Sequence, residues 1–158
     1  MNPILKTGIA IGLGCVAWTF VMGFTGWYKD PAMVKAFFLV IGIEIVLLVW
    51  GLRQTAAANG YGAQVLAGTA MAGVAAAIIF CGSLVFTTVV FPSYFQELEA
   101  MGRGRLQAQG LKEEEISQAL ATQAKVQTPF FQALFGAIGT VITGLVASLV
   151  IAVFSRRK

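Results

Sequence analysis

Four long apolar stretches, residues 8–27, 36–52, 65–91 and 130–154, constrain the fold of this 158-residue chain more than any other feature. A hydrocarbon core about 30 Å thick needs roughly 20 apolar helical residues to cross it, and each stretch meets or approaches that length. Because lipid offers no water to backbone amides and carbonyls, a crossing segment must close its own hydrogen bonds as a helix. We therefore expect an all-α integral membrane protein, a bundle of four transmembrane helices forming one domain over residues 1–158.

Composition supports this class, since only 11% of the residues are charged against roughly 25% in soluble domains. The first stretch follows Lys6 as a signal peptide would, but it is too long and has no convincing cleavage site, so we interpret it as a retained helix. The predicted partner is the lipid bilayer. The net charge of +4 reports topology and anionic lipid rather than nucleic acid.

The connection between the third and fourth stretches, residues 92–128, is long and rich in charge. Apolar residues recur there at helical spacing. Gly110 suits the end of one helix, and Glu113–Glu115 suit the first turn of the next. We predict an extramembrane helical hairpin, with a solvated loop as the alternative.

Glu44 is the only acidic or basic residue inside the four stretches. A charge at mid-bilayer costs at least about 2.5–3.5 kcal/mol on insertion scales, so a residue of this kind needs a structural or functional reason. At ~1.5 Å per residue Glu44 lies near mid-bilayer, at the depth of Thr19 and Thr140 and close to Trp18. We expect a carboxyl that is neutral much of the time, because a surrounding of low dielectric disfavours the charged form.

Three interpretations of this intramembrane polar site remain open. Glu44 makes a neutral hydrogen bond between helices, or it binds a proton, a cation or a cationic substrate, or it contacts a lipid headgroup or another protein. The direction in which its side chain points is not predicted, because the second stretch is apolar on every side.

Small residues recur at every fourth position of the last stretch, at Gly136, Thr140, Gly144 and Ser148. Faces of this kind let helices approach closely in lipid. We interpret them as packing within the chain, and an oligomer interface is the alternative.

The remaining residues give no reason to expect catalysis. The chain has no histidine, no buried pair of acids and no phosphate-binding glycine loop. Cys15 and Cys81 lie at different depths, which argues against a disulfide between them, and without histidine a cysteine-based metal site is not expected. We predict no enzyme activity, no cofactor and no metal.

Short motifs along nearly the whole chain carry a resemblance to a known family. They are LKTGIAIGL, GLRQ, YGAQVLAG, FPSYFQEL, QGLKEEEI, and TP followed by TGLVASLVIAVFSRRK. In these motifs the chain resembles the domain of unknown function 4199 family of small bacterial membrane proteins. The resemblance implies four membrane helices with a charged segment before the last, and no biochemistry.

Lysine and arginine divide evenly between the two faces of the predicted bundle, but the compact cluster at 156–158 favours both termini in the cytoplasm. We expect a bacterial cytoplasmic (inner) membrane protein. The leading functional hypothesis is a structural or accessory protein that packs through small-residue faces, in a homo-oligomer or a larger membrane assembly. The alternative is a small oligomeric channel or transporter with Glu44 as its proton or cation site.

Overall fold

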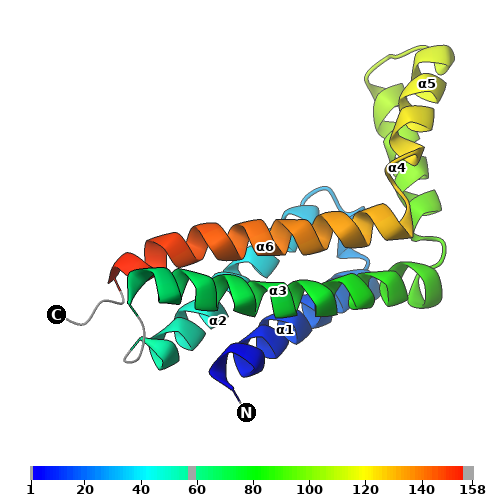
Figure 1. Cartoon of the computed structure of the whole chain (residues 1–158). Helices are drawn as coiled ribbons and strands as arrows, with labels where there is room; N and C mark the ends of the chain where they lie inside the picture. Colours follow the sequence, from blue (N-terminus) through cyan, green and yellow to red (C-terminus); the bar gives the residue numbers. More distant parts are fainter. Residues whose placement is uncertain (1, 57–59, 155–158) are drawn as a thin grey trace.

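The computed structural model describes residues 2–56 and 60–154, and every regular element in these ranges is helical (Figure 1). Four of the helical segments are long and apolar enough to cross a membrane. The predicted all-α class with four membrane-length helices is therefore confirmed. The four segments are α1 (Pro3–Thr25), α2 (Leu39–Thr55) with the preceding 3₁₀ helix η2 (Val34–Phe38), α3 (Tyr61–Val85) with the π-helical turn η3 (Phe86–Val90), and α6 (Pro129–Phe154).

Helix α1 begins at Pro3, before the predicted start at residue 8. The Asn2 side chain caps it by accepting a hydrogen bond from the Ile4 amide at 3.0 Å, and proline suits the first helical position. The helix ends where Gly26 adopts a φ of 69°, a left-handed conformation that favours glycine. Lys6 thus lies inside α1, and its Nζ stands 5.3 Å from the centre of the Trp50 ring, which gives the cation an aromatic partner.

Helix α3 packs most extensively against α6 and α1, and α2 packs against α1 and, less extensively, against α6. Small residues set the close approach of α3 and α6. A methyl group added to Gly144 would overlap the Ala72 side chain, and one added to Gly68 would overlap Ser148. The buried core at the junction consists of Ile11, Cys15, Leu48, Leu52, Ala67, Met71 and Ala75.

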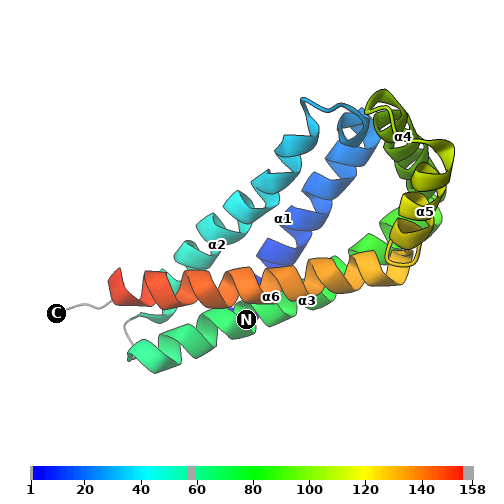
Figure 2. The same cartoon turned by 90° about the horizontal axis from the view of Figure 1, so that it is seen from above.

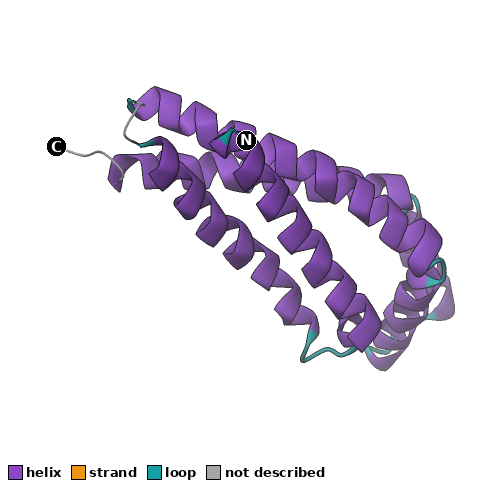
Figure 3. Ribbon diagram, turned by 90° about the horizontal axis from the view of Figure 1, so that it is seen from below, coloured by secondary structure: helices purple, strands orange, loops and turns teal. Residues whose placement is uncertain are grey.

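Helices α2 and α6 do not stay together along their whole length. Figures 2 and 3 show them converging toward the end where α2 leads into α3 and diverging toward the end where α1 leads into α2. This divergence leaves room between α2 and α6 on the side of the α1–α2 connection. Helix α1, in contrast, stays against α3, since a Cβ on Gly8 would meet Val74 and one on Gly23 would meet Phe86.

Two amphipathic helices, α4 (Tyr94–Ala108) and α5 (Glu113–Ala124), follow α3 and pack against each other (Figure 1). Gly110 closes α4 with a φ of 79°. Ile116 and Leu120 of α5 are the buried residues of this pair. In Figure 1 the pair projects away from the four long helices.

The basic residues at 156–158, on which the predicted orientation rests, lie outside the described residues.

Candidate functional site

A cavity of about 640 Å³ lies in the space where α2 and α6 diverge. All four long helices contribute to its wall, and the α1–α2 connection and the start of α4 border it. One side is lined by a stripe of α6 at helical spacing, with Gln132, Phe135, Gly136, Gly139, Thr140 and Thr143. Another is lined by η2 and α2, with Val34, Lys35, Phe37, Phe38, Val40, Ile41 and Glu44. Residues of a single chain thus line the cavity, which is not closed on all sides.

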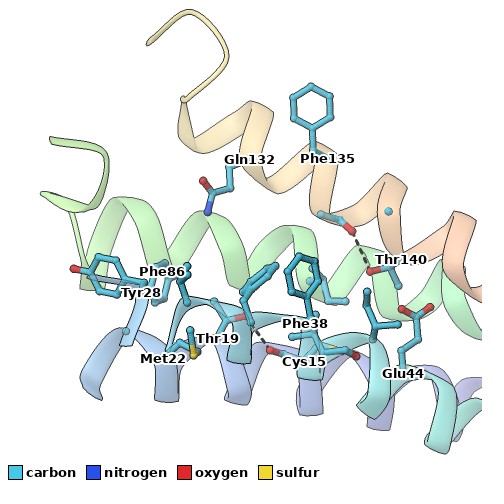
Figure 4. Close-up of a pocket in the computed structure, with 18 of the residues that line it drawn as sticks. Cys15, Thr19, Met22, Tyr28, Phe38, Glu44, Phe86, Gln132, Phe135 and Thr140 are labelled. Carbon is cyan, nitrogen blue, oxygen red and sulfur yellow. Dashed lines mark hydrogen bonds between the residues drawn. The ribbon is translucent and has the colours of Figure 1, made fainter. Parts of the chain in front are cut away.

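Glu44 lies at the inner end of this cavity, on α2. Figure 4 shows Glu44 and Thr140 at one end and Tyr28 and Phe86 at the other. The Glu44 side chain is 4% exposed, and its Oε1 atom is buried without a hydrogen-bond partner among the described residues. A Cβ atom on Gly144 would lie 3.3 Å from Oε1, so the carboxyl stands against α6. Glu44 thus points into the protein and not into lipid.

Of the predicted neighbours of Glu44, Thr19 and Thr140 line the same cavity, whereas Trp18 does not. Thr19 and Thr140 line the cavity, but each hydroxyl donates to the carbonyl one turn earlier in its own helix, at 3.0 Å. The Trp18 indole N–H donates to the Ala36 carbonyl at 2.9 Å and ties α1 to η2. None of these three donors is bonded to the carboxyl.

The small-residue face of α6 has two different environments. Gly144 and Ser148 are buried against α3, and the Ser148 hydroxyl donates to the Gly144 carbonyl at 2.6 Å. Gly136 and Thr140, nearer the α5 end of the helix, line the cavity instead. Packing within the chain uses one half of this face, and the cavity uses the other.

The outer end of the cavity is held by a polar contact between the α1–α2 connection and α4. The Tyr28 hydroxyl donates to the Glu97 carboxylate, the Lys29 ammonium lies 2.8 Å from Glu97 Oε2, and Ser93 donates to Oε1 at 3.3 Å. Hydrogen bonds from Lys29 and Tyr28 lower the pKa of Glu97, and the bond to Glu97 raises the pKa of Lys29. The contact is therefore an ion pair over the neutral range.

Aromatic rings line the wall beside this contact. The Tyr94 ring lies 5.1 Å from Tyr28 and 5.4 Å from Phe86, between ring centres, and its side chain bonds to that of Gln132. Burial raises the pKa of Tyr94, so its hydroxyl stays neutral. The outer part of the cavity is therefore rich in aromatic rings, and Lys35 and Gln132 add polar groups to the cavity wall.

Several cavity residues were not singled out in the sequence, including Phe38, Ile79, Phe86, Gln132, Gly139 and Thr143. A signal existed for those on α6, because the small and polar residues between 132 and 143 repeat at helical spacing. No comparable signal marks Ile79 or Phe86, which sit in an apolar stretch without a polar face.

These features define an all-helical protein with four membrane-length helices and an internal cleft that ends at a buried carboxyl. The chain belongs to the family described as "Protein of unknown function (DUF4199)", whose model matches residues 6–157. That match confirms the resemblance seen in the short motifs. No curated protein and no solved structure matches the chain.

Proposed function

We propose that this chain is an integral membrane protein that binds a small, largely apolar molecule taken up from the bilayer. The observation that supports this proposal most directly is the cavity of about 640 Å³, which ends at the Glu44 carboxyl, whose Oε1 has no partner among the described residues. Pockets of roughly 300–1,000 Å³ with apolar walls and few polar groups are typical small-molecule sites. Such a role fits a carrier or transporter better than a packing protein without a ligand.

In this proposal α1, α2, α3 and α6 span a bacterial inner membrane with both termini in the cytoplasm. Trp27 and Tyr28 at one end of the long helices, and Trp50 and Tyr61 at the other, suit the two membrane interfaces. The charged pair α4–α5 then lies outside the lipid, on the side opposite the termini. Its polar faces favour that position, since unpaired charges are costly in hydrocarbon.

A binding or transport function is also better supported than a catalytic one. One carboxyl cannot act as both the acid and the base of a reaction, and the sequence has no histidine to complement it. The residues of a single chain line the cavity, so binding does not depend on the oligomer that a channel built around Glu44 would need.

The test is photolabelling in vesicles with a neutral alkyl diazirine, followed by mass spectrometry of the labelled peptides. We expect labels on the cavity-lining stretches of α2 and α6. Gly139→Phe fills the cavity, because a Cβ there meets nothing within 4 Å, and it should remove those labels. The matched control is Gly73→Phe on α3, equally open but outside the cavity. Labelling confined to lipid-facing surfaces and equal in all three proteins would contradict the proposal.

A second candidate function is the accessory or structural role, in which α4–α5 docks a partner protein. The projection of this pair away from the long helices favours it (Figure 1). Gly102 and Leu120 lie close together, with a Cβ on Gly102 3.5 Å from the Leu120 side chain. Replacing residues 103–119 by a short glycine-serine turn should therefore shorten the pair without disturbing its base. Loss of co-purifying proteins with unchanged photolabelling of the cleft would support this role, and unchanged co-purification would exclude it.

A further inference from the structure

The inner end of the cleft contains an acceptor atom that lacks a donor. Glu44 is 4% exposed and its Oε1 has no partner in the described part of the chain. Buried polar atoms are paired in the great majority of proteins, and an exception calls for an explanation such as a missing ligand. Oε1 stands against Gly144 of α6 and has almost no accessible surface, so the cavity that Glu44 lines reaches the carboxyl at its other oxygen.

Three side chains that line the cavity already donate their proton elsewhere. The hydroxyls of Thr19 and Thr140 each donate to a backbone carbonyl, as does the thiol of Cys15, which donates to Val40 at 3.7 Å. The oxygens of Thr19 and Thr140 keep lone pairs, so they add acceptors to the cavity wall. A molecule that brings donors of its own therefore complements this part of the cavity.

The remaining wall of the cavity favours a ligand with an apolar body. Its wall is mostly aliphatic and aromatic, and exposed phenylalanines flank the gap between α2 and α6, with Phe38 66% and Phe135 58% exposed. Figures 2 and 3 show α2 and α6 diverging there, and in the proposed membrane arrangement a gap between two spanning helices faces the hydrocarbon. Access from the hydrocarbon phase suits a molecule that is already dissolved in the membrane.

We propose that the cleft binds a lipophilic primary amine, with its ammonium group on the Glu44 carboxylate, at the oxygen that faces the cavity, and its alkyl or aryl body against the phenylalanine-lined wall. This inference rests on the proposed function and adds the chemical class of the ligand. An ammonium supplies three donors and a positive charge. It therefore compensates a buried carboxylate through a charge-assisted hydrogen bond.

The test is competition for the neutral alkyl diazirine in vesicles containing the whole chain. The competitors are octylamine, octanol and octanoate, compared at equal mole fraction in the lipid. Hydrogen bonds to charged groups are roughly twice as strong as neutral ones, so octylamine should displace the probe at about tenfold lower mole fraction than octanol. Octanoate should compete least, because it brings negative charge toward Glu44.

The decisive variant is Glu44→Gln, which keeps the shape of the side chain and removes its charge. We expect the neutral probe still to label the cleft of this variant, which shows that the cleft is formed, while octylamine and octanol now compete equally. If octylamine and octanol compete equally in the unaltered protein, or if octylamine still competes better in Glu44→Gln, the proposal that the ligand is an amine is wrong. The cleft would then remain a binding site for another ligand. Absence of any labelling in the cleft would overturn the proposed function as well.

Discussion

Replacing Glu44 by methionine should make the protein more stable and unable to recognise an amine. The Glu44 side chain is buried at 4% exposure, and its Oε1 has no partner in the described residues. Methionine has a similar length and an unbranched, adaptable side chain. The substitution therefore removes an unpaired polar atom while it keeps the space between α2 and α6 filled.

The expected gain follows from two opposing contributions. Leaving a buried acceptor unsatisfied costs about 1–3 kcal/mol, and this cost disappears in Glu44→Met. A hydrophobic replacement of similar volume usually costs less than about 1.5 kcal/mol. We therefore expect the free energy of unfolding to rise by about 1 kcal/mol.

Thr7 provides a matched control because its hydroxyl is the other buried side-chain atom without a partner in the described residues. Thr7 is 0% exposed and does not line the cavity. Thr7→Val should also gain about 1 kcal/mol by the same reasoning, but it should leave amine competition unchanged. The two variants separate the cost of an orphan polar atom from the recognition of a ligand.

The measurement is reversible unfolding in mixed bicelles with increasing detergent, followed by far-ultraviolet circular dichroism. Leu48→Ala calibrates the assay, since truncating this fully buried side chain should cost about 2–5 kcal/mol. A loss of more than about 1 kcal/mol in Glu44→Met would refute the reasoning, because removal of an unpaired group costs less than that. It would mean that the carboxyl holds the helices together through a hydrogen bond.

Three further outcomes are expected. Gly144→Leu should lose about 2 kcal/mol or more by overpacking against Ala72, whereas Gly139→Leu, with nothing within 4 Å of its Cβ, should change the same unfolding free energy by less than about 0.5 kcal/mol. The contact between the α1–α2 connection and α4 should be present above the ordinary pKa of glutamate, near pH ~4.3, and should be lost as the pH falls through the lowered pKa of Glu97. Spin labels at Ala32 and Glu99 should report the change in separation between the two segments. Glu97→Gln should abolish this pH dependence. Trp18→Phe removes the 2.9 Å bond to the Ala36 carbonyl and should cost about 1 kcal/mol in the bicelle assay, with no change in competition between octylamine and octanol.

The helices could be predicted from the sequence because lipid imposes a simple rule. A segment that crosses hydrocarbon must be helical and apolar over a known length, so the four stretches were identifiable from residue type alone. The inclusion of Lys6 in α1 was missed, since a cation normally ends an apolar stretch. Its placement over the Trp50 ring is a tertiary contact that no local pattern reports.

The depth of Glu44 was predictable, but its direction was not. In water a helix shows its inner side by an apolar face, whereas in lipid both the inner and the outer sides of α2 are apolar. Counting the rise per helical residue therefore placed Thr140 at the same depth as Glu44. It did not show that the Thr140 hydroxyl donates to a backbone carbonyl within α6. Because of that use, Thr140 does not serve as the donor that its depth suggested.

The cleft depends on how the helices are arranged relative to one another, which the sequence of a single helix does not reveal. The small residues of α6 form one continuous row, and this row packs tightly where Ala72 and Gly68 of α3 face it. Toward the α5 end the same row borders the cavity, because α2 diverges there with the bulky Phe38 on the preceding 3₁₀ helix. A small-residue row thus becomes either an interface or a cavity wall, according to whether a neighbouring helix stays beside it. Glu44 sits where the tight packing gives way to the cavity, with one carboxyl oxygen against Gly144, and the proposed ligand meets the protein at that point.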